Sequence, residues 1–113
     1  MALTHPIPDE LAELIARRFR LLAEPMRIRL LDDLRDGEAT VGELAEALAT
    51  SQQNVSKHLG ALAEARMLGR RKEGNRVYYR IVDENVFALC EQVCGSVQDH
   101  LRALNELVEG VRA

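Results

Sequence analysis

The chain has 113 residues, which is enough for one domain with a single core and too few for most large catalytic scaffolds. Apolar residues make up 47% and charged residues 29% of the sequence, a composition typical of a globular protein and not of a disordered or membrane-spanning one. The core is expected to be aliphatic because there is no Trp and only two Tyr and two Phe, and the net charge of -3 by itself argues against a nucleic-acid partner.

Three short helices are predicted in the first part of the chain. Apolar residues recur at helical spacing over residues 9–23, which predicts the first helix. Pro25 suits the first turn of a second helix, which ends before Gly37. Thr40, followed three residues later by Glu43, has the spacing of a capping box at the start of a third helix.

A fourth helix opens at Ser51 and has two distinct faces. Val55, Leu59 and Leu62 form a stripe that is expected to be buried. The opposite face carries small polar side chains and one lysine: Gln52, Gln53, Ser56, Lys57 and Gly60. Gln can pair with adenine and Lys with guanine or phosphate, whereas a merely solvated face would favour Glu and Lys. The third and fourth helices therefore predict a helix-turn-helix whose second helix enters the major groove of DNA.

A hairpin with a basic tip is predicted between residues 67 and 81, with its turn at residues 73–75. The alternation places one set of side chains on one face, Arg76, Tyr78 and Arg80, and another on the opposite face, Val77, Tyr79 and Ile81. Residues 57–80 hold seven basic and two acidic residues, which leaves 8 basic and 16 acidic for the rest of the chain. An acidic protein can thus present one positive face to a polyanion.

The predicted DNA-binding residues come from the fourth helix and from this hairpin, which is the wing of the fold. They are Gln52, Gln53, Asn54, Ser56 and Lys57 on the helix, and Arg71, Lys72, Asn75 and Arg76 on the wing. A merely solvated turn is the alternative interpretation of the wing residues. The predicted fold class is mainly α with a small β-hairpin: a winged helix-turn-helix with five helices and a two-stranded wing.

The last helix, predicted over residues 84–109, has an apolar seam too long for so small a domain to cover. We expect it to form a dimer interface with helix 9–23, although burial within one chain is the alternative. The whole chain, residues 1–113, is then a single domain. Cys90 and Cys94 lie four residues apart on this helix, close to one face.

Three segments of the chain resemble the ArsR/SmtB family of bacterial winged-helix repressors: LLAEPMRIRLLDDL, TVGELAEALATSQQNVSKHLGALAEARML and RRKEGNRVYYRI. The resemblance covers roughly residues 10–108. It implies a homodimer that holds operator DNA and, in most members, releases it when a metal or an oxidant binds. It also implies that Gln52, Gln53, Ser56 and Lys57 occupy the family's DNA-contacting positions, while His58 is structural.

The resemblance also bears on the inducer. The cysteines of the family's arsenic-type site are missing from the third helix. The family's zinc-type site uses an Asp, a His two residues later and a further pair of ligands from the partner subunit. The matching positions here are Asp83, Asn85, Ser96 and Asp99, so two of these ligands are missing. Cys90 and Cys94 are the remaining candidates for sensing the inducer. They could bind a thiophilic metal ion or arsenite, respond to oxidants or sulfur species, or simply pack within the helix seam.

The expected function is that of a homodimeric, sequence-specific repressor, with a thiophilic metal ion or arsenite as the favoured inducer. A thiol-based redox or sulfur-responsive repressor and a winged-helix interaction module that binds no DNA are the alternatives. An enzyme is not expected, since the chain has no Gly-rich phosphate loop, HExxH motif or GxSxG elbow. Residues 1–9 have neither the basic start nor the apolar run of a targeting sequence, so a cytoplasmic protein without membrane contact is expected.

Overall fold

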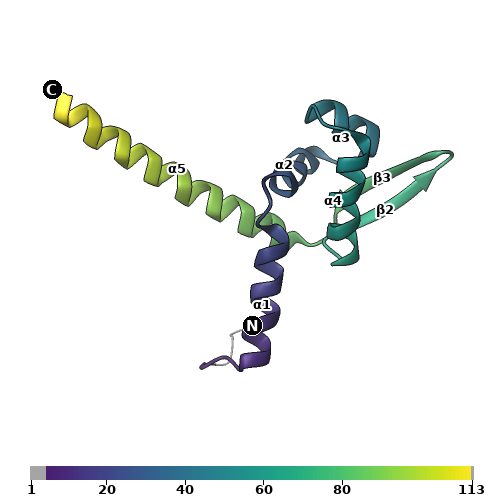
Figure 1. Ribbon diagram of the computed structural model, residues 1–113, viewed down its shortest axis with the longest axis horizontal. Coiled ribbons are helices and arrows are strands. Elements are labelled where there is room, and N and C mark those ends of the chain that lie inside the picture. Colours follow the sequence, from purple (N-terminus) through teal and green to yellow (C-terminus); the bar gives the residue numbers. More distant parts are fainter. Residues whose placement is uncertain (1–4, 113) are drawn as a thin grey trace. The chain divides into compact units, whose positions relative to one another are not determined.

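A computed structural model describes residues 5–112 of the chain. These residues form five α-helices, a short 3-10 helix and three strands. Figure 1 labels the helices α1 to α5 and the strands β2 and β3. In chain order the elements are α1 (Asp9–Leu22), α2 (Pro25–Asp33), η1 (Leu34–Asp36), β1 (Ala39–Thr40), α3 (Val41–Ala47), α4 (Gln52–Glu64), β2 (Leu68–Glu73), β3 (Arg76–Ile81) and α5 (Glu84–Arg112). The ends of the expected domain, residues 1–4 and 113, lie outside the described part.

Contacts divide the chain into two compact units, with the division after Val82. The first unit holds α1 to β3 and contains the helix-turn-helix and the wing. The second unit is α5, which Figure 1 shows as one continuous helix. It extends three residues further than the predicted end at residue 109.

The core of the first unit is aliphatic, as the composition predicts. α4 lies at its centre and packs against α2, α3 and β2. The largest side chains with almost no exposed surface come from these elements and from the turn before β2: Leu30, Leu44, Val55, Leu59, Leu62 and Met67. Tyr79 is the aromatic side chain that joins them in this buried set. Burial of this aliphatic surface stabilises the position of α4.

The sheet has three antiparallel strands in the order β1-β3-β2, and not only the two of the expected wing. The third strand, β1, is two residues long and pairs Ala39 with Tyr79 and Thr40 with Tyr78. So short a strand produces no alternating pattern, which is why the sequence did not predict it. In the hairpin, Arg71 lies opposite Tyr78 and Glu73 lies opposite Arg76, so these four side chains share one face.

The end of the second helix differs slightly from the prediction. The second helix was expected to run on to Gly37, but α2 ends at Asp33 and the chain continues as the tighter turn η1. Gly37 follows with a φ of 135°, a conformation that favours glycine. Across residues 5–112, no helix combines the length and the apolar character that a membrane crossing requires.

Candidate nucleic-acid interface

A capping box fixes the start of α3. Oγ1 of Thr40 accepts a 3.1 Å hydrogen bond from the backbone N of Glu43, and Oε1 of Glu43 accepts a 3.0 Å bond from the backbone N of Thr40. Hydrogen bonds from Thr40 to the carboxylate of Glu43, first from its backbone and then from its side chain, lower the pKa of Glu43 below its usual value. The capping box that the spacing predicted is confirmed, and it sets the first helix of the helix-turn-helix.

The turn between α3 and α4 is held by local hydrogen bonds. The backbone N of Thr50 donates to the carbonyl of Ala45 at 3.0 Å, and Ala49 adopts a left-handed conformation with a φ of 52°. Ser51 caps α4, because its Oγ accepts from the backbone N of Asn54 at 3.1 Å. Nδ2 of Asn54 donates to Oγ1 of Thr50 at 3.1 Å. Asn54, a predicted DNA-binding residue, is half-buried and uses its amide to hold this turn.

The two faces of α4 are as the sequence predicted. Val55, Leu59 and Leu62 have no exposed surface. Four of the five side chains of α4 that were predicted to bind DNA are exposed: Gln52, Gln53, Ser56 and Lys57. The first two occupy the first turn of α4, where the backbone N–H groups of a helix are also available to phosphates. The exposed face therefore combines amide, hydroxyl and ammonium groups that can hydrogen-bond to base edges.

The tip of the wing is exposed. Lys72, Asn75 and Arg76 surround the turn, in which Gly74 has a φ of 61°. Figure 1 shows the β2–β3 hairpin extending beyond α4. Among residues 5–112, neither Lys72 nor Arg76 forms an ion pair. Both cations are thus available for phosphate oxygens.

Arg71, also predicted to bind DNA, has carboxylate partners within the chain. It pairs with Glu38 at 2.5 Å and with Glu73 at 2.8 Å. The hydrogen bond from Arg71 lowers the pKa of Glu38, and the two carboxylates, Glu38 first, raise the pKa of Arg71. Arg71 is therefore paired with carboxylates of the protein, whereas Lys72 forms no ion pair among residues 5–112.

Two residues near this surface were not singled out by the sequence analysis. Glu38 precedes β1 and is 33 residues away from Arg71 in the chain, so no local pattern pointed to it. Arg70 is exposed on β2, with its guanidinium carbon 5.8 Å from the ring centroid of Tyr79. The excess of basic residues between positions 57 and 80 was a signal for Arg70, but that count did not distinguish one cation from another.

His58 is structural, in agreement with the sequence analysis. It is the one polar or charged residue in the described part of the chain that is buried, and its ring accepts a hydrogen bond from Arg27. Burial first, and then the charge of Arg27, lowers the pKa of His58. The imidazole faces the core, away from the exposed polar face of α4.

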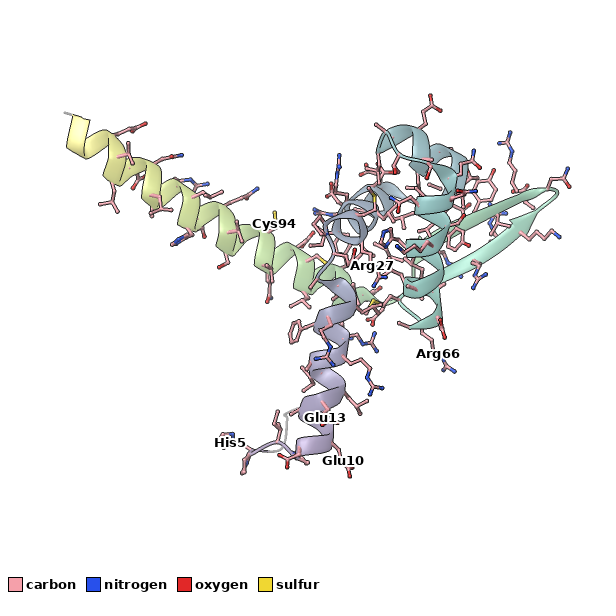
Figure 2. All side chains as sticks on the ribbon, viewed as in Figure 1. His5, Glu10, Glu13, Arg27, Arg66 and Cys94 are labelled. Atoms are coloured by element: carbon pink, nitrogen blue, oxygen red, sulfur yellow. The ribbon has the colours of Figure 1, made fainter. Side chains whose placement is uncertain are left out.

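The thiols of Cys90 and Cys94 lie on α5, one half-buried and the other exposed, and neither forms a disulfide. Figure 2 shows Cys94 projecting from the helix. In the described part of the chain, no three His, Cys, Asp or Glu side chains come together as a metal site would require. A soft metal ion at these thiols would therefore need further ligands from a second copy of the chain or from solution.

The sequence is similar to those of known regulators. A helix-turn-helix domain model matches residues 22–69. KmtR, a transcriptional regulator of Mycobacterium tuberculosis, is 38% identical over 81 residues, which are 72% of this chain and 62% of KmtR. This chain thus spans somewhat less than two thirds of the length of KmtR. A homolog of the repressor SmtB from Synechocystis is 35% identical over 88 residues, which are 78% of this chain and 67% of that protein.

Solved structures show the same fold over most of the chain. The antimony-specific transcriptional repressor AntR superposes with a TM-score of 0.80 at 33% identity, covering 88% of this chain and 90% of AntR. A homodimeric winged helix-turn-helix domain from Mycobacterium bovis, described as a possible ArsR-family regulator, gives 0.75 at 34% identity, covering 89% and 94% of the two chains. These are regulators and not enzymes, and the chain belongs to the ArsR/SmtB family of winged helix-turn-helix transcriptional regulators.

Proposed function

We propose that the chain is a cytoplasmic, homodimeric repressor that binds operator DNA and releases it when a thiophilic ligand reaches Cys90 and Cys94. The observation that carries the DNA-binding part is the exposed polar face of α4, backed by a fully buried apolar face. Such a helix is fixed in the core by one side and free to enter a major groove with the other.

Base reading is assigned to four exposed side chains, Gln52, Gln53, Ser56 and Lys57. Lys72 and Arg76 at the wing tip contact phosphates, and Asn75 adds a hydrogen-bonding group there. Asn54, whose amide holds the turn, acts by positioning the helix. Arg71 was predicted to join the phosphate-binding residues, but it forms ion pairs with Glu38 and Glu73.

The test of this part is operator binding measured by fluorescence anisotropy with Gln53→Ala combined with Lys57→Ala. Each lost contact to a base edge is expected to weaken specific binding by about 1–3 kcal/mol. Glu64→Ala, at an exposed position at the end of the same helix, is the matched control and is expected to bind like the original chain. Unchanged affinity in the double variant would show that this face does not read DNA. Binding that does not depend on salt would favour the protein-interaction alternative.

Dimerisation is assigned to α1 and α5. Both helices expose apolar side chains that a monomer leaves in water, namely Leu14 and Phe19 on α1 and Val93, Val97, Leu101, Leu104, Leu107 and Val108 on α5. The spacing of those on α5 resembles the seam of a coiled coil. Two copies would present two α4 helices to successive major grooves, about 34–36 Å apart. The homodimeric Mycobacterium bovis domain supports this assignment.

Cys90 and Cys94 are the proposed sensing residues. One helical turn separates them, so both sulfurs could reach one soft ion, and a second copy could supply two more. AntR, with 33% identity, is named as antimony-specific, and antimony, like arsenic, is thiophilic. The favoured inducer is accordingly a thiophilic metal ion or arsenite, and a redox or sulfur-responsive thiol pair is the second candidate.

Anisotropy of the protein–operator complex distinguishes these inducers. The complex is titrated with arsenite or a soft metal ion, and separately with mild oxidant or persulfide, under otherwise reducing conditions. Cys90→Ser with Cys94→Ser is expected to keep DNA binding and to abolish release, while Ser96→Ala on the same helix is expected to keep both. Release that persists in the double variant would remove the thiols from the mechanism, and they would then be packing residues.

A further inference from the structure

The guanidinium group of Arg71 binds two carboxylates, those of Glu38 before β1 and Glu73 at the end of β2. Its Nε and Nη2 donate to the two oxygens of Glu38 at 3.2 and 2.5 Å. Its Nη1 donates to Oε2 of Glu73 at 2.8 Å. All three nitrogens of the guanidinium group are therefore in use within the protein, and the contact with Glu38 is bidentate.

The same group is stacked on the sheet. The guanidinium carbon of Arg71 lies 4.7 Å from the ring centroid of Tyr78, the residue directly opposite it on β3. Contact with the ring face is favourable for a planar cation. Tyr78 in turn lies opposite Thr40 of β1. Because the strand order is β1-β3-β2, the side chain of Arg71 starts on β2, crosses β3 and reaches the residue that precedes β1. It spans the whole sheet.

The role inferred for Arg71 rests on the proposed DNA-binding function. We infer that Arg71 is a positioning residue that fastens the wing to the segment before α3, with Glu38 as its partner, and that it does not neutralise a phosphate of the operator. Phosphate binding is left to Lys72 and Arg76. If Arg71 turned to a phosphate, Glu38 and Glu73 would lose their counter-charge beside a polyanion, which disfavours that exchange.

The contacts of Arg71 with Glu38, Glu73 and Tyr78 are called the clamp below, and they stabilise the wing. β1 contributes only two pairs to β3, so most of the hairpin has a neighbour on one side alone. An isolated two-stranded hairpin is only marginally stable in water. An isolated surface ion pair would add little, but a bidentate pair joined to a second carboxylate and an aromatic ring forms a network with fixed geometry. This network holds the wing in a defined position relative to α3 and α4.

The salt dependence of operator binding tests the inference. Losing a phosphate contact makes the plot of log K against log salt shallower by about 0.9. Lys72→Ala, the neighbouring cation on β2, is expected to show this change. Arg71→Ala and Arg71→Lys are both expected to keep the original slope while binding several-fold more weakly at every salt concentration, since Lys retains the charge but not the fork. A shallower slope in Arg71→Ala, with full binding in Arg71→Lys, would overturn the inference.

Amide hydrogen exchange on the DNA-free protein tests the clamp independently of the proposed function. Arg71→Ala and Glu38→Ala are each expected to raise exchange across β2 and β3, and the double variant to raise it no further. Lys72→Ala is expected to leave exchange unchanged. Unaltered protection in both single variants would overturn the clamp. Failure of the original chain to bind any operator would refute the proposed function, and the exchange result would still decide whether Arg71 anchors the wing.

Discussion

Arg27 on α2 donates a hydrogen bond of 3.0 Å from its Nε to Nδ1 of His58 on α4. The same guanidinium donates through Nη1 to the carbonyl of Leu21 at the end of α1, at 2.9 Å. The pair therefore joins three helices of the first unit. Because Nδ1 accepts, the neutral ring carries its proton on Nε2, and protonation of Nδ1 would remove the acceptor and place two cations together.

The first prediction is a loss of stability in mild acid. His58 has an ordinary pKa of 6.5 when unfolded and a lower pKa in the folded protein. Between these two values the unfolded chain binds more protons, so the free energy of unfolding is expected to fall as the pH drops below about 6.5. Urea denaturation at about pH 7.5 and about pH 5.5 measures this difference.

His58→Gln is expected to weaken this dependence, because the titrating group is gone. His100→Gln, on the exposed surface of α5, is the control that should retain it. Glu38 and Glu43 have pKa values lowered from 4.5, so their contribution is lost at lower pH and does not confound the comparison. An identical pH dependence in both His variants would contradict the assignment.

The second prediction concerns Arg27 itself. Arg27→Ala removes the donor to buried Nδ1 of His58 and the donor to the carbonyl of Leu21. An unsatisfied buried polar group costs about 1–3 kcal/mol, so the free energy of unfolding is expected to fall by about that amount. Arg29→Ala, at an exposed position on the same helix, is expected to change it by less than about 0.5 kcal/mol. Equal effects of the two substitutions would show that the hydrogen bonds contribute nothing.

Local patterns in the sequence predicted much of this molecule. The three-residue spacing of Thr40 and Glu43 predicted a capping box, and the spacing of Val55, Leu59 and Leu62 predicted the buried face of α4. Each depends on residues within one or two helical turns, where the geometry of the backbone fixes which side chains meet.

The features that escaped prediction depend on contacts between distant segments. Glu38 and Arg71 are 33 residues apart, and only the folding of β1 onto β3 brings them together. Polar residues can be counted from a sequence, but the tertiary structure decides which of them become partners.

The third prediction tests the capping box. Thr40→Ala removes the acceptor for the backbone N of Glu43, and it is expected to lower the free energy of unfolding by about 1 kcal/mol. Glu46→Ala, at an exposed position within the same helix, is the matched control and is expected to have little effect. Thermal or urea unfolding measures both. A loss in Thr40→Ala no larger than that of the control would mean that α3 does not depend on its cap.

The fourth prediction separates the two faces of α4. Leu59→Ala opens a cavity at a fully buried position and is expected to cost about 2–5 kcal/mol of stability. Ser56→Ala, on the exposed face, is expected to leave unfolding unchanged while weakening operator binding at moderate salt. Measuring both properties for both variants is decisive. A stability loss at Ser56, or full operator affinity without its hydroxyl, would contradict the assignment of this face to DNA.

The last prediction concerns the apolar seam of α5. At 100° per residue, Val97, Leu101, Leu104 and Val108 fall within about 60° of one another, and all four are at least 45% exposed. A carboxylate in such a seam would be desolvated without a partner on association. Leu101→Asp is therefore expected to convert a dimer into a monomer in light-scattering or sedimentation measurements. Ala103→Asp adds the same charge on another face of the helix and is expected to remain dimeric, whereas dissociation of both variants, or a monomeric original chain, would refute the α5 interface.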